Sequence, residues 1–382
     1  MQLFTTQYRP ESGWSRALPT ELDSAQTLVL VFGGRALGDD ARPFDELAAA
    51  LPQSLRVGCS TAGEISDSLV HDASLSVAIA RFDHTRLKLA VTPVAGAAES
   101  ADAGARLAAD LATGGDDLSA VFVLSDGLCV NGTPLVDALT RGLPAGVSIT
   151  GGLAGDGSRF EKTWVLAGQR PAAGVIAALG LYGPRLRVGR GCDAGWLDFG
   201  PERRITRSEG NVLYELDGKP ALDLYKTYLG DLAQGLPGSA LLFPLSIRAR
   251  QSGAKPLVRT ILAIDEARKS MTFAGEMPQG HVARLMRTTN DNLIDSASTA
   301  VGHAAQDWAG SGDALVVSVS CVGRRLVLGE RCDEEVETIV EGAPAGAGHV
   351  GFYSYGEISP GLEGGVSQLH NQTMTVTVFG EA

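Results

Sequence analysis

The chain has 382 residues, of which 44% are hydrophobic, and a formal net charge of −12. This length and apolar content suffice for one or two buried cores. No run of Lys or Arg interrupts the acidic balance, and phosphate binding needs clustered basic residues. The sequence therefore argues against nucleic acid and against an anionic membrane as partners.

The expected location is the cytoplasm. The N-terminal residues lack the basic segment and apolar stretch that are typical of a secretory signal. The longest apolar run, residues 172–183, is shorter than the roughly 18 residues that a membrane-spanning helix needs. The five cysteines are odd in number, widely spread and without a CxxC pair, which favours reduced thiols over disulfides.

A strand–helix–strand pattern occurs three times along the chain. The expected strand, helix, and second strand with its turn lie at residues 27–34, 43–52 and 55–64, then at 120–127, 133–144 and 147–156, and finally at 313–324, 334–344 and 349–358. In each unit a glycine followed by an acid comes just after the second strand. The repetition predicts an α/β fold of mixed sheets built from pseudo-repeated β-α-β units.

The three glycine–acid pairs are Gly63-Glu64, Gly155-Asp156 and Gly356-Glu357. In open α/β sheets, ligands bind beyond the carboxyl ends of the strands. If the three strands are neighbours, the acids face one ligand crevice at that edge. The alternative is ordinary turn chemistry, in which glycine–acid pairs are common.

A different region separates the second and third units. Residues 239–250, 257–265 and 269–276 are typical of a strand meander, and residues 290–310 of an amphipathic helix. Asn290 is the expected cap of this helix, and Gly310 its end. We place the division into two domains within residues 200–235, giving domains at 1–215 and 216–382.

Five segments together resemble the FIST family of bacterial sensory domains. "GCSTAGEI" (58–65) and "GGLAGDGSRFEKTWV" (151–165) are similar to signatures of its N-terminal domain. "CVGRRLVLGER" (321–331), "GFYSYGEI" (351–358) and "LHNQTMTV" (369–376) are similar to those of its C-terminal domain. The resemblance covers nearly the whole chain in the expected order.

The resemblance implies a ligand-sensing module in signal transduction rather than an enzyme. It further implies a separate output partner, expected to be a histidine kinase or a diguanylate cyclase or phosphodiesterase. Stand-alone members include a branch of haem proteins that sense nitric oxide. The leading expectation is therefore a bound haem b with a gas as the sensed ligand.

A noncovalent haem needs an axial ligand, usually histidine, in an apolar pocket. The candidates for this one ligand are His370, His349 and His281, in that order. His370 lies in the "LHNQTMTV" motif, and the segments of His370 and His349 flank the "YSYGEI" turn. For any lone histidine, a hydrogen-bonded structural role is the alternative.

A second hypothesis is a small amine-bearing ligand, such as an amino acid, whose ammonium group the three acids hold. Short polar side chains and glycine backbones would complete this site: Cys59, Ser60, Thr61, Gly63, Gly155, Ser354, Tyr355 and Gly356. Three unpaired carboxylates would raise one another's pKa values, so a basic partner is expected nearby. Arg324 and Arg325 are the candidates.

A third hypothesis is a cysteine-dependent hydrolase or isomerase that uses Cys59. A catalytic cysteine needs its pKa lowered by a helix N-terminus or a neighbouring basic group. No such neighbour is evident near Cys59 in the sequence. A small buried cysteine at the end of a strand explains the residue equally well.

Overall fold

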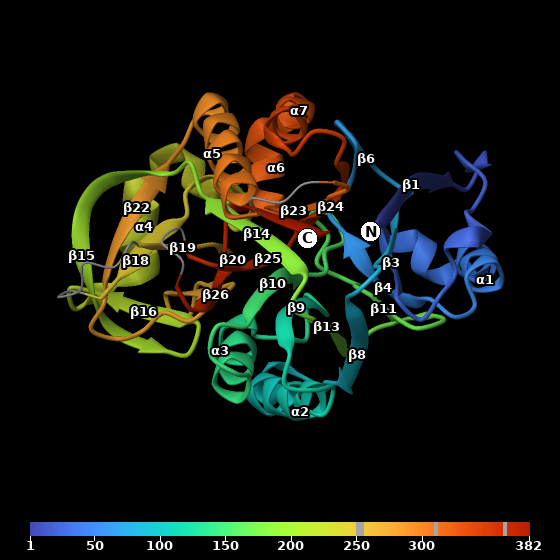
Figure 1. The fold of residues 1–382 in the computed structure, drawn as a ribbon. Coiled ribbons are helices and arrows are strands. Elements are labelled where there is room, and N and C mark those ends of the chain that lie inside the picture. Colours follow the sequence, from blue (N-terminus) through green and yellow to red (C-terminus); the bar gives the residue numbers. More distant parts are fainter. Residues whose placement is uncertain (250–255, 309–311, 362–364) are drawn as a thin grey trace.

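The structure is a computed structural model that describes residues 1–249, 256–308, 312–361 and 365–382 (Figure 1). Three mixed sheets lie around the centre of the molecule, and a fourth sheet lies beside them, at the left of Figure 1. The predicted α/β fold of mixed sheets is confirmed.

The first sheet has the order β12-β11-β4-β3-β7-β1-β2, the second β26-β25-β10-β9-β13-β8, and the third β14-β27-β23-β24-β5-β6. The first comprises β1 (Gln2–Arg9), β2 (Gly13–Trp14), β3 (Thr27–Gly34), β4 (Leu55–Thr61), β7 (Leu75–Arg81), β11 (Val165–Ala167) and β12 (Pro171–Ala172). The second comprises β8 (Arg86–Pro93), β9 (Leu118–Ser125), β10 (Ser148–Leu153), β13 (Val175–Tyr182), β25 (Gly356–Pro360) and β26 (Ser367–His370). The third comprises β5 (Glu64–Ser66), β6 (Leu69–His71), β14 (Leu186–Asp193), β23 (Leu315–Cys321), β24 (Gly348–Ser354) and β27 (Met374–Glu381).

The fourth sheet has eight strands in the order β19-β18-β22-β15-β16-β21-β20, with β17 on β16. Its strands are β15 (Leu197–Glu209), β16 (Val212–Leu216), β17 (Lys219–Pro220), β18 (Leu245–Arg248), β19 (Leu257–Arg259), β20 (Ile261–Asp265), β21 (Ser270–Phe273) and β22 (Val282–Arg287). The helices are α1 (Ala41–Ala50), α2 (Ser100–Ala112), α3 (Gly132–Gly142), α4 (Ala221–Leu229), α5 (Asn290–Trp308), α6 (Val322–Leu328) and α7 (Cys332–Gly342).

Each predicted β-α-β unit is present. The parallel pairs are β3 with β4, β9 with β10, and β23 with β24, one in each of the first three sheets. Helix α1 connects the first pair, α3 the second, and α6 with α7 the third. A crossover helix is what two parallel neighbours require, because a tight turn can join only antiparallel strands.

After each glycine–acid turn the chain leaves its own unit and pairs with the next one. Strand β5 follows β4 but pairs with β24 of the third sheet. Strand β25 follows β24 but pairs with β10 of the second sheet. Strand β11 follows β10 but pairs with β4 of the first sheet. The three units thus exchange strands in a closed cycle.

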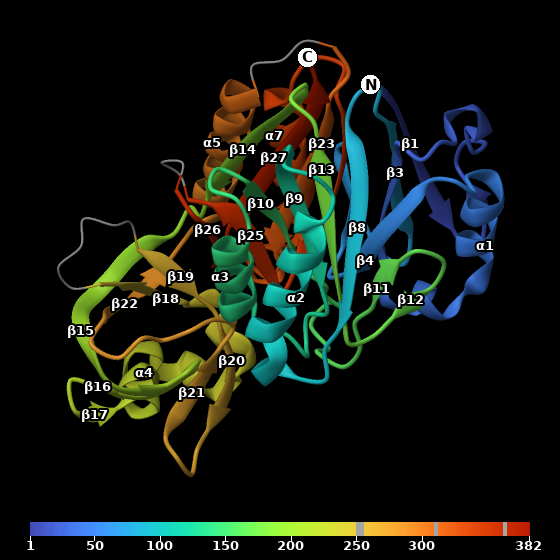
Figure 2. The same ribbon diagram turned by 60° about the horizontal axis from the view of Figure 1, so that its bottom comes forward.

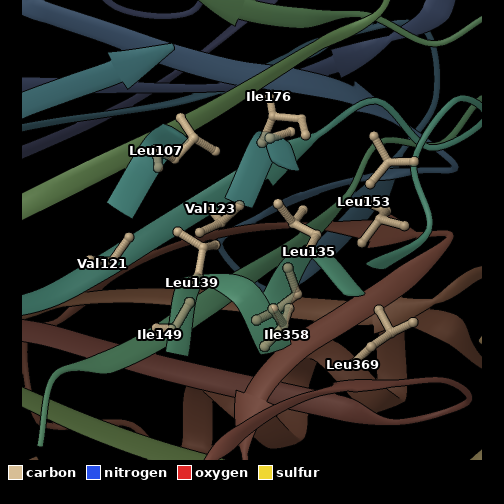
Figure 3. Packing of buried hydrophobic residues seen from close by; sticks show 14 of the residues in the cluster. Leu107, Val121, Val123, Leu135, Leu139, Ile149, Leu153, Ile176, Ile358 and Leu369 are labelled. Atoms are coloured by element: carbon tan, nitrogen blue, oxygen red, sulfur yellow. The ribbon is translucent and has the colours of Figure 1, made fainter. Parts of the chain in front are cut away.

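Helices α2 and α3 cover one face of the second sheet (Figure 2). Figure 3 shows the apolar core between them, where Leu135 and Leu139 of α3 pack together with Ile358 of β25 and Leu369 of β26. The last two residues come from the C-terminal part of the chain. The same core therefore holds together segments from both predicted domains.

Several local predictions differ from the structure, and one helix was missed. Helix α5 is capped by Thr289, whose hydroxyl accepts the backbone N–H of Asn292, while Asn290 donates its side-chain N–H to the carbonyl of Leu328. Gly310, its predicted end, lies outside the described residues. Residues 322–324 were assigned to a strand but begin α6, because buried partners on α5 and α7 hold Arg324. Helix α2 was not predicted.

Strand exchange predicts that residues 1–215 do not fold stably alone. In that fragment β5 lacks β24 and β10 lacks β25, so two sheets end in unpaired edges. We expect the fragment to show no cooperative thermal transition by circular dichroism, whereas the full chain shows one. A cooperative transition and a dispersed NMR spectrum of the fragment would contradict this prediction.

Candidate functional site

A polar cleft lies at the carboxyl ends of β3 and β4, where the sequence predicted a ligand crevice. Its volume is about 750 Å³. The wall is formed by the 3₁₀ helix η2 (Arg35–Asp39), the turn after β4, residues 72–73, and the loop after the second unit. The lining residues are Gly34, Arg35, Ala36, Asp39, Thr61, Ala62, Glu64, Asp72, Ala73, Gly157, Arg159 and Lys162.

Glu64 is the one residue of the three predicted acids that lines this cleft. The hydroxyl of Thr61 donates to its Oε1 at 2.5 Å, and the backbone N–H and hydroxyl of Ser74 donate to its Oε2 at 3.0 and 3.1 Å. Its side chain is only 1% exposed. Burial raises the pKa of Glu64 to about 7, although these hydrogen bonds oppose the shift.

Glu357 has the same hydrogen-bond pattern in the third unit. Ser354 donates to its Oε1 at 2.6 Å, and the backbone and hydroxyl of Thr373 donate to its Oε2 at 3.1 and 2.9 Å. Burial raises its pKa to about 7, and the positive charge of Arg324 opposes this shift. The charge of Asp72 raises the pKa of Glu64 further. Glu64 is thus the counterpart of Glu357 in its hydrogen bonds and in its raised pKa.

Asp156 is buried and holds the loop that follows it. The backbone N–H groups of Phe160, Glu161 and Lys162 donate to its carboxylate at 2.8 to 3.0 Å. The hydroxyl of Tyr355 also donates to Asp156, and the ring of Tyr355 stacks on Phe160. These bonds keep the pKa of Asp156 below its ordinary value despite burial. Asp156 therefore shapes the cleft loop without lining it.

The three acids do not face one crevice, but the turns that carry them meet through backbone hydrogen bonds. Ala62 N–H donates to the carbonyl of Tyr353 at 2.7 Å, and Gly155 N–H to that of Ser60 at 2.9 Å. Tyr355 N–H donates to the carbonyl of Leu153 at 3.1 Å. The backbones converge, while each carboxylate is satisfied within its own surroundings.

Arg324 lies away from the cleft, fully buried between three helices. Its guanidinium pairs with Glu335 of α7, and both side chains are 0% exposed. It also donates to Ser296 Oγ and the Leu293 carbonyl of α5, at 3.0 and 2.8 Å. Such a buried ion pair holds α6 and α7 in a fixed register, because separating the two residues would leave a buried charge without a partner, which costs free energy.

The charged groups of the cleft are mostly paired. Arg35 pairs with Glu161 at 2.9 Å, and Lys162 with Asp39 at 2.8 Å. In the described part of the chain, Arg159 forms no ion pair of this kind, although its charge helps to lower the pKa of Asp72. Among the described residues, the cleft therefore offers one guanidinium, that of Arg159, and one carboxyl group, that of Glu64, that form no ion pair.

Cys59 offers no activated thiol. It is 0% exposed within β4, between β3 and β11, and burial raises its pKa well above the ordinary value. A neutral thiol is a poor nucleophile. Its neighbour Ser60 is also structural, because its hydroxyl accepts the backbone N–H of Trp164 at 3.0 Å.

A second, largely apolar pocket of about 420 Å³ contains His370. Its wall includes Trp196, Leu257, Val258, Met286 and Val366. The ring Nε2 of His370 bonds to the carbonyl of Ser359 at 2.9 Å, and burial lowers the pKa of His370 to about 4. The ring is therefore neutral, and Nδ1 carries the lone pair.

The other two candidate histidines lie in different surroundings from His370. His349 belongs to β24, and both of its ring nitrogens are hydrogen-bonded, one to Ser318 and one to the carbonyl of Asp67. His281 precedes β22 and is not part of the apolar pocket's wall. No group of three or more His, Cys, Asp or Glu residues with metal-binding geometry occurs among the described residues.

Sequence reasoning found Thr61 and Glu64 but missed the charged wall of the cleft. Arg35 and Asp39 follow β3 at the same sheet edge at which Glu64 follows β4. That placement was a usable signal, since parallel neighbours end at one edge. Asp72 and Arg159 carried no comparable signal, because their position depends on strand exchange.

The fold defines an α/β protein made of interlocked repeats. Residues 27–219 match the FIST N domain and residues 221–360 match the FIST C domain. The chain therefore belongs to the FIST family, a family of sensory domains in signal transduction that respond to small ligands.

Other similarities are more distant. An uncharacterised protein of Methanocaldococcus jannaschii is 28% identical over 202 residues, which are 50% of this chain and 38% of that protein. A chorismatase crystal structure matches 100% of this chain and 98% of its own at 12% identity and a TM-score of 0.35. A crystal structure of a cyanuric acid hydrolase from A. caulinodans matches 78% of this chain and 99% of its own, at 12% identity and a TM-score of 0.18. Neither structural likeness bears on activity.

Within the described ranges, every helix is too short or too polar to cross a lipid bilayer.

The raised pKa of Glu64 predicts a pH-dependent stability. The folded chain binds this proton more tightly than the unfolded chain, so the free energy of unfolding falls as pH rises from about 4.5 to about 7. This fall is roughly 3 kcal/mol for one such group. We expect Glu64→Gln to remove it, as measured by urea unfolding at pH 5 and pH 8.

The matched control is Glu337→Gln on the exposed face of α7, which should leave the pH profile unchanged. An identical pH profile for Glu64→Gln and the natural chain would contradict a raised pKa at Glu64.

Proposed function

We propose that the polar cleft binds a small ligand with a protonated amine, such as an amino acid, and that its occupancy is signalled to a partner protein. One comparison carries this proposal. Glu357 and Glu64 have the same hydrogen bonds, but of the two only Glu64 lines the polar cleft, and no basic side chain among the described residues forms an ion pair with it. A ligand ammonium group in the cleft would supply the missing charge at Glu64.

The chemistry of the remaining lining is compatible with such a ligand. Thr61 and the backbone of the turn provide neutral polar groups beside Glu64, and Arg159 provides an unpaired guanidinium for an anionic group. A charge-assisted hydrogen bond contributes roughly 1.5 to 3 kcal/mol. The proposal is one of binding rather than turnover, since Cys59 is buried and neutral.

Membership of a signal-transduction family supports an output through another protein. We propose a histidine kinase, a diguanylate cyclase or a phosphodiesterase as this partner.

The test is a panel of primary amines and amino acids assayed by thermal shift and calorimetry. We expect a stabilising ligand in the natural chain and in Glu357→Gln, but not in Glu64→Gln. The two substitutions are chemically identical and affect carboxylates with the same hydrogen bonds, so Glu357→Gln is the matched control. Equal binding by all three chains would contradict a role for Glu64.

Binding should also depend on pH. Only ionised Glu64 attracts a cation, and its pKa is about 7, so affinity should rise by about tenfold between pH 6 and pH 8. Calorimetry at both values, with an amine that stays protonated, measures this change. A pH-independent affinity would exclude Glu64 as the contact.

A second candidate function is haem-based sensing of nitric oxide, with His370 in the apolar pocket as its supporting observation. The residues fit haem b in their chemistry: the wall is apolar, the imidazole is neutral, and Nδ1 makes no hydrogen bond among the described residues. Haem, when bound, supplies an iron that takes a gas ligand. His370 would hold the iron, and Trp196 and Met286 would exclude water.

An absorption spectrum of the protein from haem-sufficient cells tests this second candidate. We expect a stoichiometric Soret band that shifts with nitric oxide and is lost in His370→Ala, but retained in His349→Ala and His281→Ala. A colourless protein that does not take up added haem would contradict it.

A further inference from the structure

Helix α6 carries two adjacent arginines whose side chains leave it in different directions. Arg324 reaches the buried partners on α5 and α7, and Arg325 reaches back to the N-terminal part of the chain. Figure 1 shows α6 close to α5 and α7. One short helix is thus connected to both the cleft and the helices above the third sheet.

Arg325 does not line the cleft, but it holds two segments that do. Its guanidinium donates to the carbonyl of Ala62, and it forms a bidentate pair with Asp72 at 2.9 and 2.7 Å. Ala62 and Asp72 are both lining residues. Arg325 therefore fixes the distance between two segments. One is the turn that carries Glu64, and the other leads to Ser74, which donates a hydrogen bond to Glu64.

Gly63 makes room for this arginine. Its φ of +142° is unfavourable for residues with a side chain, and an added Cβ would lie 2.7 Å from Nη1 of Arg325. The glycine of the "TAGE" turn is thus explained by backbone conformation and by the approach of a side chain from the FIST C domain.

Arg324 holds α6 to its neighbouring helices. Arg324 and Glu335 are both 0% exposed, and Glu335 also accepts hydrogen bonds from Tyr353 and Ser320 at 2.7 and 3.2 Å. A close-packed interior of this kind transmits a displacement instead of absorbing it. A shift of α6 must therefore shift α5 and α7.

We propose that Arg325 is a positioning residue of the cleft and that α6 relays the state of the cleft to α5 and α7. The site in the FIST N domain is then incomplete without the FIST C domain. Control of the cleft by a bound ligand rests on the proposed function, whereas the linkage of cleft walls to helices rests on the contacts alone.

The experiment is amide hydrogen exchange of the full chain, with methylammonium chloride as the probe and sodium chloride at equal ionic strength as the reference. The chains compared are the natural one, Arg325→Gln, Arg325→Lys and Arg86→Gln. Arg86 is a matched control that is distant in the sequence. It donates to the carbonyl of Gly114, pairs with Asp117 and lies over the ring of Tyr182. Arg325 makes the same three kinds of contact, with Ala62, Asp72 and Tyr353.

In the natural chain and in Arg86→Gln we expect the probe to slow exchange at residues 61–64 and 72–74 and to change exchange in α5 and α7. In Arg325→Gln the response of α5 and α7 should be lost and the affinity for the probe should fall by about tenfold. Arg325→Lys, which keeps one charged donor, should restore part of both. An unchanged helix response in Arg325→Gln would overturn the relay.

A separate arm distinguishes this inference from the proposed function. If the probe does not protect residues 61–64 in the natural chain, the amine proposal fails, and Asp72→Asn then tests the relay without any ligand. Asp72 is 72% exposed in its side chain, so this substitution is not expected to unfold the protein. Faster exchange in α6 and α7 would support the relay, and a change confined to residues 67–73 would overturn it.

Discussion

The backbone hydrogen bonds between the three glycine–acid turns are the constraint on which the rest of this structure depends. Each turn lies against the backbone of another unit, through Ala62 and Tyr353, Gly155 and Ser60, and Tyr355 and Leu153. Because the strand after each turn then pairs within the neighbouring unit, no unit can be completed alone. The arrangement leaves little room for side chains at the centre, and this explains why glycine and small residues dominate the turns.

The buried acids are a consequence of this closure. Glu64 and Glu357 lie where a strand changes sheets, and each binds backbone and hydroxyl groups that this crossing leaves without partners. Two nearly equivalent carboxyl groups have thereby acquired different surroundings: the charge of Arg324 acts on Glu357, and the polar cleft borders Glu64. Because the units are pseudo-symmetric, the electrostatic environment of Glu64 can be compared with that of Glu357, which has the same hydrogen bonds within the same chain.

Much of the fold could be predicted from the sequence, because its units are encoded locally. Apolar β-branched runs and the repeated glycine–acid pairs identified all three β-α-β units, and parallel pairing placed Thr61 and Glu64 at a sheet edge. The exchange of β5, β11 and β25 could not be predicted, since register between distant strands has no local signal. The same limit hid Asp72 and its ion pair with Arg325, a residue that was predicted to compensate the buried acids instead. Arg324 was predicted to compensate the acids directly, whereas its ion pair is with Glu335 and only its field reaches Glu357.

The strand exchange also has a consequence for synthesis on the ribosome. Strand β5 is made early, yet its partner β24 emerges only after most of the chain has been translated. Until then β5 and the exposed edge of β10 are unsatisfied, and such edges are prone to wrong pairing. The nascent chain must keep these strands apart during that interval. Translation rate and chaperone access, more than final stability, are therefore expected to limit the yield of native protein.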